Sequence, residues 1–425
     1  MRRVLTLIVC ITALVLSACG KNPQNNNARI RFLHGSLDSG TLSIRLNNDS
    51  TDFASGLTYQ SANAYQDIGA GAQEIKVVGA GGVNQLDSTF NLAKGSSYTL
   101  AIFGTASATA GTMILDDIAA PASGNMKLRL AHLAAGVGAL DVYALAAGAD
   151  LNTSNPRAIA TATGTTSPFV EFTTGAYRIV LTPQGSKDVV YDSGSQTFAD
   201  KAAATLVIYS SGSTKLANGT LLLTDGSGTA IATANPYARI KTVNAAPDYA
   251  FIDTLVDGSI KFSNVPYKGV SSYLIVPAGA RNLKVEATNA PGTFLANTTA
   301  TLASGRDYSV VVTEQGATTQ IVPLADTNLL PSLGRDRLRF VNATTDASSL
   351  DVLINYTKQV GNLARATASA YLEVDANTYN FTFNAAGTTT ALLVMPSVTF
   401  DANQRYTLYV VGSGSQLSGV VTVDN

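Results

Sequence analysis

The sequence contains one strand-like segment four times, and this repetition constrains the fold more than any other feature. Each copy alternates basic and apolar residues and ends in His or Asn. The copies occupy residues 28–34, 126–132, 238–244 and 336–342. Their first basic residues are Arg29, Lys127, Arg239 and Arg337, with spacings of 98, 112 and 98 residues. Repeats of this regularity predict four copies of one structural unit.

Apolar residues recur with a period close to two inside each repeat, which indicates strands rather than helices. In the first repeat we expect seven short strands. They lie near residues 29–34, 41–46, 64–68, 73–78, 85–92, 98–103 and 112–116. Seven strands in fewer than one hundred residues are typical of an immunoglobulin (Ig)-like sandwich. The predicted fold class is therefore all-β, with four tandem Ig-like β-sandwich domains after a cleaved signal peptide and a flexible tether.

The predicted domain organisation follows from these repeats and from the segments between them. We expect a lipoprotein signal peptide at residues 1–18, a lipidated Cys and tether at 19–27, and Ig-like repeats at 28–120, 126–231, 237–328 and 336–425. The connecting segments are short and contain Pro or small residues. Short linkers predict a semi-rigid rod rather than freely jointed domains.

Turn residues recur at matching places in the repeats. Gly71, Gly175, Gly279 and Asn377 precede one strand of each repeat. Gly and Asn enter left-handed backbone at the lowest cost, so a turn is expected there. A Leu/Phe-x-x-Gly/Asn-x-x-Tyr motif ends in Tyr98, Tyr308 and Tyr406, where a tyrosine corner would bond its hydroxyl to the backbone. The second repeat lacks the motif at 198–204, which predicts a looser corner.

The N-terminus carries the signals of an exported lipoprotein. Arg2 and Arg3 precede an apolar stretch at residues 4–16, which is too short to span a bilayer but suits a secretory signal. The sequence Leu-Ser-Ala-Cys that ends at Cys19 resembles the bacterial lipobox. The resemblance implies diacylglycerol on the Cys19 thiol and cleavage before it. Because Cys10 would leave with the signal, no disulfide is expected in the mature chain.

These signals predict that the protein is localised in the bacterial cell envelope. Several acyl chains on one residue hold a protein on a membrane almost permanently. We therefore expect the membrane to be a partner through lipid on Cys19, with the protein at the outer membrane or cell surface. Residues 20–27 are polar and Asn-rich, which indicates a flexible tether.

A polar pair recurs in all four repeats and includes the histidines of the chain. The first positions are His34, His132, Asn244 and Asn342, and nine residues later stand Ser43, Asp141, Asp253 and Asp351. Asn can replace His as a hydrogen-bonding group but cannot titrate near neutrality. We therefore interpret the pairs as structural bonds between neighbouring strands, ahead of an ion or ligand site on the Asp and ahead of catalysis. Asp116, Asp225 and Asp326 are expected to be solvated strand ends.

Several sequence motifs resemble those of a known family. They are the alternating basic strand, Leu-Asp-Val-Tyr at 140–143, Pro-Ala-Gly-Ala at 277–280 and Leu-x-x-Gly-x-x-Tyr-x-Val at 302–310. The layout resembles the bacterial domain-of-unknown-function family 4397, which is found in secreted and surface proteins. The resemblance implies architecture and location, and it supplies no catalytic residues.

Composition narrows the function classes. Only 13% of the residues are charged and the net charge is −1, so no basic surface for nucleic acid is expected. With two His and no recognised motif we expect no enzyme, no cofactor and no metal site. The predicted function is a non-catalytic, lipid-anchored surface protein with a structural, adhesive or ligand-presenting role toward a surface polymer or protein. The alternative is a carbohydrate-binding module-like surface protein, which would use exposed aromatic side chains. A third hypothesis, an enzyme with its site at a domain interface, would need a cluster of buried carboxylates.

Overall fold

The computed structural model describes residues 26–226, 230–233 and 235–424. The predicted signal peptide, Cys19 and most of the tether lie outside these residues. In the described ranges the secondary structure is β, apart from three short 3₁₀ turns at Ala80–Gly82, Leu151–Thr153 and Gly414–Gln416. None of the described residues forms a helix with the length and hydropathy needed to cross a membrane.

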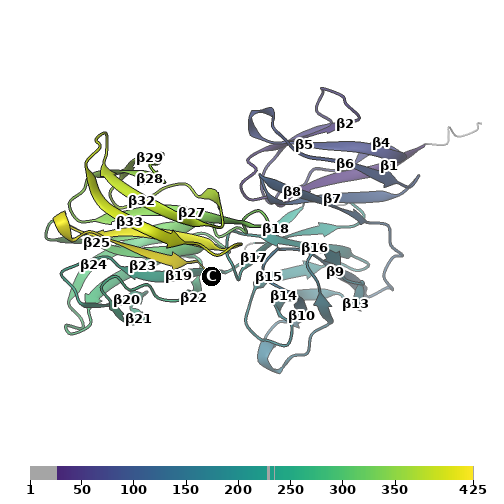
Figure 1. The fold of residues 1–425 in the computed structure, drawn as a ribbon. Helices are drawn as coiled ribbons and strands as arrows, with labels where there is room; N and C mark the ends of the chain where they lie inside the picture. Colours follow the sequence, from purple (N-terminus) through teal and green to yellow (C-terminus); the bar gives the residue numbers. More distant parts are fainter. Residues whose placement is uncertain (1–25, 227–229, 234, 425) are drawn as a thin grey trace, which may run out of the picture.

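The strands group into four β-sandwiches (Figure 1), which we number from the N-terminus. The first contains β1 (Asn27–His34), β2 (Leu42–Leu46), β3 (Ala54–Leu57), β4 (Gln66–Gly69), β5 (Gly71–Val78), β6 (Asn84–Leu92), β7 (Ser97–Thr105) and β8 (Ala108–Leu115). The second contains β9 (Asn125–Leu133), β10 (Leu140–Ala146), β11 (Ala158–Thr161), β12 (Thr165–Thr166), β13 (Val170–Thr173), β14 (Gly175–Pro183), β15 (Tyr191–Phe198), β16 (Ala203–Ser210), β17 (Ala217–Leu223) and β18 (Ile231–Thr233). The strand β18 extends beyond residue 231, where the second repeat was expected to end.

The C-terminal half repeats the same arrangement. The third sandwich contains β19 (Tyr237–Asn244), β20 (Phe251–Val256), β21 (Ser259–Pro266), β22 (Leu274–Pro277), β23 (Gly279–Ala287), β24 (Phe294–Leu302), β25 (Asp307–Gln315) and β26 (Thr318–Asp326). The fourth contains β27 (Arg335–Thr344), β28 (Ser349–Ile354), β29 (Thr357–Ala364), β30 (Thr367–Ala368), β31 (Leu372–Asp375), β32 (Thr378–Ala385), β33 (Ala391–Thr399), β34 (Arg405–Gly412) and β35 (Ser418–Val423).

The four sandwiches share one strand order, except that the strand equivalent to β4 is divided into β12 and β13 in the second and into β30 and β31 in the fourth, and that the second adds β18 at a sheet edge. In the first, one sheet is β4-β1-β7-β8 and the other is β3-β2-β5-β6, and β1 runs parallel to β7 with Ile30 opposite Tyr98. The all-β class and the tandem sandwiches of the prediction are confirmed. The first sandwich has eight strands where the sequence predicted seven, because β3 is a four-residue strand whose Ala-Ser-Gly-Leu sequence has little strand propensity. The order also differs from the seven-strand immunoglobulin pattern, in which the first strand pairs with the second.

The alternation along β1 separates two environments. Ala28, Ile30 and Phe32 pack into the core of the first sandwich, while Leu33 points to the opposite face of the sheet. There it contacts an apolar cluster with Ala131 of β9 and Tyr209 of β16. The first sandwich therefore buries the outer face of one sheet against the second.

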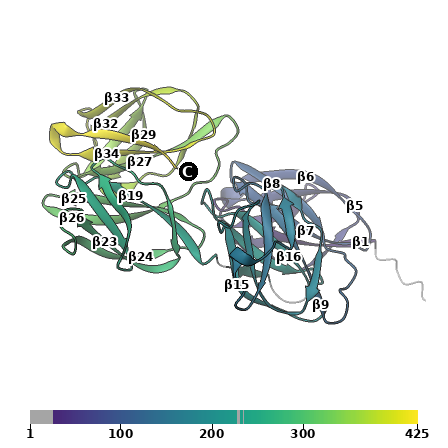
Figure 2. The ribbon, with the colours of Figure 1, turned by 90° about the horizontal axis from the view of Figure 1, so that it is seen from below.

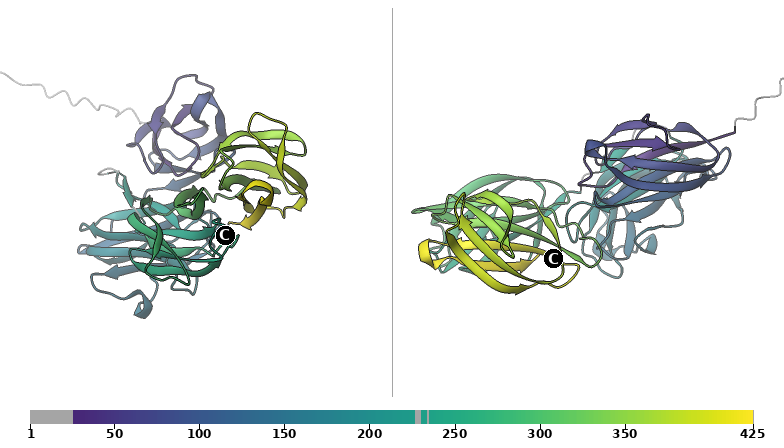
Figure 3. Two further views of the ribbon diagram at one scale, coloured as in Figure 1. Left: turned by 90° about the vertical axis from the view of Figure 1, so that its left-hand side faces the viewer. Right: turned by 45° about the horizontal axis from the view of Figure 1, so that its top comes forward.

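The third and fourth sandwiches pack in the same way. Val243 of β19 and Val311 of β25 share an apolar cluster with Val341 of β27 and Tyr409 of β34. The chain thus forms two lobes of two sandwiches each, seen side by side in Figures 1 and 2 and in the right panel of Figure 3. The expectation of a rod is wrong, because the apolar outer faces of these sheets are buried by pairing.

Hydrogen bonds join the two lobes where the second sandwich contacts the third. The backbone N–H of Asn328 donates to the Gly212 carbonyl at 2.9 Å. The Thr214 N–H donates to Asp307 Oδ2 at 3.2 Å, and the Thr214 hydroxyl also bonds to Arg239.

Candidate functional site

The two histidines hold the loop that follows the first strand of their sandwich. His34 Nε2 lies 2.7 Å from the Gly40 carbonyl, and its Nδ1 accepts the Ser36 N–H at 3.2 Å. His132 makes the same contacts, with the Gly138 carbonyl at 2.6 Å and the Ala134 N–H at 3.3 Å. Since Nδ1 accepts a backbone N–H, the ring is neutral with its proton on Nε2.

Asparagine performs the same task in the other two sandwiches. Asn244 Nδ2 donates to the Tyr249 carbonyl at 3.1 Å, and its Oδ1 accepts the Ala246 N–H at 3.1 Å. Asn342 Nδ2 donates to the Ala347 carbonyl at 3.3 Å, and Oδ1 accepts the Thr344 N–H at 3.3 Å. Asn and neutral His each present one donor and one acceptor, which explains their exchange at this position.

Burial keeps the imidazoles neutral. Both rings are fully buried. This burial lowers the pKa of His34 and of His132, although the hydrogen bonds to Gly40 and Gly138 oppose the shift. A buried, neutral ring with both nitrogens engaged by backbone is a structural group.

The second members of the predicted pairs bind elsewhere. Asp141 Oδ2 accepts the Gly185 N–H at 2.9 Å, and Asp253 Oδ1 accepts the Asn264 N–H at 2.8 Å. Asp351 accepts the Asn362 and Gly387 N–H groups at 2.8 and 3.1 Å, and these bonds lower its pKa.

In the first sandwich Ser43 takes this position, and hydrogen bonds from Arg45 and Ser43 lower the pKa of Asp52. In the described part of the chain, no hydrogen bond joins the two members of any of the four pairs. The prediction of a bond between them is therefore wrong: each member instead binds loops or neighbouring side chains of its own sandwich.

Three tyrosines bond back to the chain five residues earlier. The hydroxyl of Tyr98 accepts the Ala93 N–H at 3.0 Å, that of Tyr308 the Ala303 N–H at 2.8 Å, and that of Tyr406 the Asp401 N–H at 2.9 Å. The turn between these partners needs positive φ, with Gly95 at 79° and Asn403 at 65°. In the second sandwich Lys201 adopts φ 60° at this place, and Ala204 occupies the tyrosine position.

The other predicted turn is only partly as expected. Gly71, Gly175 and Gly279 have positive φ, whereas Asn377 does not. The Asn377 side chain instead accepts the N–H of Thr378 at 2.7 Å, so it supports the turn through a hydrogen bond.

Buried ion pairs lie between the paired sandwiches, and the sequence reasoning missed them. Lys241 of β19 pairs with Asp424 of the fourth sandwich. In the reverse direction, Arg339 of β27 pairs with Asp326, and its Nη1 donates to the Ala325 carbonyl at 3.0 Å. The third and fourth sandwiches therefore exchange one base and one acid each. Tyr273 also donates to Asp326, at 2.5 Å.

Asp326 stays ionised in this interface. Burial alone would raise its pKa, but Arg339 and Lys241 together lower it. Asp326 and Asp116 were expected to be solvated strand ends, yet both are buried. The strand-end acids face the base-bearing strand of the neighbouring sandwich, a position that no local sequence pattern specifies.

The first and second sandwiches have only half of this exchange. Arg129 of β9 donates to Asp116 Oδ1 at 3.3 Å and to the Leu115 carbonyl at 2.7 Å, as Arg339 does in the other lobe. Asp116 also accepts the hydroxyl protons of Thr99 and Tyr65, at 2.5 and 2.6 Å. Burial raises the pKa of Asp116, although Arg31 opposes the shift.

Thr224 occupies the place of the missing acid. Its N–H donates to the Ala203 carbonyl at 2.9 Å, as the Asp424 N–H does to the Arg405 carbonyl at 2.7 Å. Arg31 Nη2 lies 3.6 Å from Asp116 of its own sandwich and, among the described atoms, is buried without a hydrogen-bond partner. Asp116 is therefore the shared counter-ion of Arg31 and Arg129.

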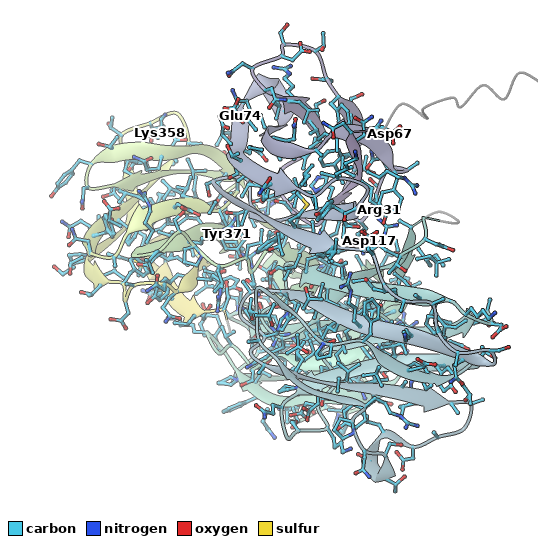
Figure 4. The ribbon with its side chains drawn as sticks, turned by 90° about the vertical axis from the view of Figure 1, so that its right-hand side faces the viewer. Arg31, Asp67, Glu74, Asp117, Lys358 and Tyr371 are labelled. Atoms are coloured by element: carbon cyan, nitrogen blue, oxygen red, sulfur yellow. The ribbon has the colours of Figure 1, made fainter. Side chains whose placement is uncertain are left out.

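An aromatic ring covers the basic residues in every sandwich. The cation–ring contacts involve Arg29 and Arg31 with Tyr65, Arg129 with Phe169, Arg239 and Lys241 with Tyr273, and Arg337 and Arg339 with Tyr371, at 4.4–5.2 Å from the ring centre. Figure 4 shows Arg31 on the side of the first sandwich that faces the second. Within the described ranges, no three His, Cys, Asp or Glu side chains are grouped to hold a metal ion.

Comparison with known proteins gives one family. The sequence profile described as Domain of unknown function (DUF4397) matches residues 28–143, 238–352 and 336–425. The unmatched stretch, 144–237, belongs mostly to the second sandwich, which also lacks the corner tyrosine and the interface acid. The chain matches no curated protein. By its repeated strands, its corner tyrosines and this match over most of its length, the chain belongs to the DUF4397 family.

Proposed function

We propose that this protein is a non-catalytic, lipid-anchored component of the bacterial cell envelope that holds or presents a surface ligand. The observation that carries the proposal is the use of its repeated polar residues. The His, Asn and Asp residues at the recurring positions bond to loops of their own sandwich, as described for His34 and Asp351. Three of the repeated bases, Arg129, Lys241 and Arg339, are occupied in joining sandwiches.

The lipobox at Cys19 supports the anchor. Acyl chains at this residue would anchor the chain in an outer membrane or at the cell surface. The polar tether at 20–27 would connect the sandwiches to this anchor flexibly. The test is fractionation of cells that express the full chain or Cys19→Ser. The wild-type chain is expected in the membrane fraction with incorporated fatty acid, and Cys19→Ser is expected to lose both. Equal membrane association of the two would contradict the anchor.

Exposure at the surface is tested separately. Protease added to intact cells is expected to cleave the protein, while a periplasmic marker stays protected. Cleavage only after disruption of the outer membrane would place the sandwiches on the periplasmic side. A substrate turned over by the purified chain would overturn the non-catalytic part of the proposal.

One observation favours carbohydrate binding as the second candidate. Tyr356 is 82% exposed at the tip of the β28–β29 hairpin and has φ 67°, an uncommon conformation for an aromatic residue. The first and third sandwiches carry Asn48 and Gly258 at positive φ in the corresponding hairpins. Exposed aromatic rings commonly stack on sugars. Glycan-array binding that is lost in Tyr356→Ala but kept in Tyr356→Phe would favour this function.

A further inference from the structure

An open cavity of about 590 Å³ is lined by the third and fourth sandwiches and by a loop of the first. Its walls include Arg337 and Arg339 of β27, Tyr371 and Thr367 beside them, and Asp38 from the loop of the first sandwich. Figure 4 shows Tyr371 toward the middle of the molecule, whereas Lys358 of the same sandwich lies at the outer side. A volume of this size is typical of small-molecule sites.

Arg337 differs from its counterparts in the other sandwiches. Lys127 lies 3.5 Å from Glu171, Arg239 pairs with Asp307 at 2.5 Å, and Arg29 is exposed to solvent. Arg337 is only 9% exposed, yet no carboxylate of the described chain lies within ion-pair distance, and its Nε is buried without a hydrogen-bond partner among the described atoms. The Arg337 guanidinium makes a cation–ring contact with Tyr371, whose ring centre is 5.2 Å away.

The two neighbouring strands explain the missing counter-ion. On one side β31 places Glu373 opposite Arg337, but the Glu373 carboxylate accepts the Ser332 hydroxyl proton at 2.8 Å, lies 4.0 Å from Arg335 Nε and forms no ion pair with Arg337. The other side differs from the third sandwich. In the third sandwich Arg239 of β19 stands opposite Asp307 of β25. In the fourth, Arg337 of β27 stands opposite Arg405 of β34, whose Nε donates to the Asp424 carbonyl at 3.2 Å. A cation has therefore taken the place of an acid, and a largely buried cation without an anion is costly.

We infer that this cavity binds the carboxylate group of a small molecule or of an acidic sugar residue, with Arg337 as the primary anion contact. The planar guanidinium can donate two parallel hydrogen bonds to a carboxylate. The Thr367 hydroxyl and the Tyr371 ring lie in the same walls and would contact the rest of the ligand. Binding would supply the counter-ion that Arg337 lacks among the described residues.

Asp38 favours a single negative charge. It also lines the cavity, and its Oδ1 accepts the Ala106 N–H at 2.8 Å. A second charge on the ligand would be repelled by this carboxylate, so a monoanion is preferred over a phosphate dianion. The inference goes beyond the proposed envelope role and does not depend on the anchor.

The test is a thermal-shift and calorimetric titration of the full chain in detergent. The probes are sodium glucuronate, glucose and inorganic phosphate, each at the ionic strength of a sodium chloride control. Glucuronate is expected to raise the melting temperature saturably, glucose to have no effect, and phosphate to bind more weakly. Arg337→Gln is expected to weaken glucuronate binding at least tenfold. Lys127→Gln, at the equivalent position with its own counter-ion, should bind normally.

A second variant keeps the inference testable if Arg337→Gln lowers the yield of folded protein. Thr367→Asp adds a carboxylate at an exposed wall position and leaves Arg337 intact, so it too should weaken glucuronate binding. No saturable shift in the wild-type chain, or an unchanged affinity in both variants, would overturn the site. Binding of sodium acetate as tight as that of glucuronate would indicate recognition of a free small carboxylate rather than an acidic sugar. Loss of this site would leave the Cys19 fractionation result unaffected, so the two proposals fail independently.

Discussion

Lys241 and Asp424, which are 183 positions apart in the sequence, form a buried ion pair that joins the third sandwich to the fourth. The Arg339–Asp326 pair runs in the opposite direction across the same interface. Each sandwich thus supplies a base to its neighbour and receives one. Such an exchange aligns two copies of one fold about an approximate two-fold axis, as in an isologous dimer interface.

Removal of one partner of this pair should be strongly destabilising. Lys241→Met leaves Asp424 buried without its cation, so we expect the third and fourth sandwiches to lose about 3–5 kcal/mol of unfolding free energy. Urea denaturation measures the loss. The control is Lys358→Met, because Lys358 Nζ lies 3.1 Å from Asp351 but its side chain is 56% exposed, and such pairs contribute less than about 1 kcal/mol. Equal losses in the two variants would contradict the role assigned to the interface pair.

Completion of the other interface should be stabilising. Thr224→Asp places a carboxylate where Asp424 stands in the fourth sandwich, across from the unsatisfied Nη2 of Arg31. Hydrogen bonds to charged groups contribute about 1.5–3 kcal/mol, so a rise of that order is expected at pH 7, measured as a higher melting temperature of the N-terminal lobe. Thr224→Asn is the uncharged control. A lower melting temperature for Thr224→Asp than for Thr224→Asn would show that Arg31 needs no second acid.

The two histidines should make the N-terminal lobe sensitive to acid. Burial lowers their pKa below the ordinary 6.5, so below that pH the unfolded chain binds more protons than the folded chain. Stability is then full above pH 6.5 and falls as the pH drops toward the folded pKa. The double variant His34→Asn, His132→Asn adopts the residues of the third and fourth sandwiches. Its melting temperature should change less between pH 7 and about pH 5, and an unchanged slope would contradict this origin of the acid sensitivity.

The corner tyrosines should contribute through their hydroxyls. Tyr308→Phe removes the acceptor of the Ala303 N–H, and the expected loss is about 1 kcal/mol in thermal or urea unfolding. Tyr356→Phe, at the exposed hairpin tip, is the matched control with an expected change near zero. If Tyr308→Phe melts at the wild-type temperature, the hydroxyl has no stabilising role.

Local sequence was sufficient for much of the fold. The period of two and the recurring motif that ends in Tyr98 were enough to predict strands and the place of the corner, since both depend on residues close together in the chain. The strand β3 was missed because a four-residue segment has too few positions to show a period. The partner of His34 was also misassigned, because a fixed spacing of nine to Ser43 does not say which of two nearby groups a ring nitrogen contacts.

By itself, the sequence determined that the chain folds as four copies of one β-sandwich, since each copy carries its own core pattern and turn residues. Only the tertiary structure decided that Arg31, Arg129, Lys241 and Arg339 lie in interfaces between paired sandwiches and that Arg337 is left facing a cavity. The physical reason is that a strand with alternating basic and apolar residues suits a solvated sheet face as well as a buried one. The choice between them depends on the acid or apolar surface that a distant segment brings opposite it.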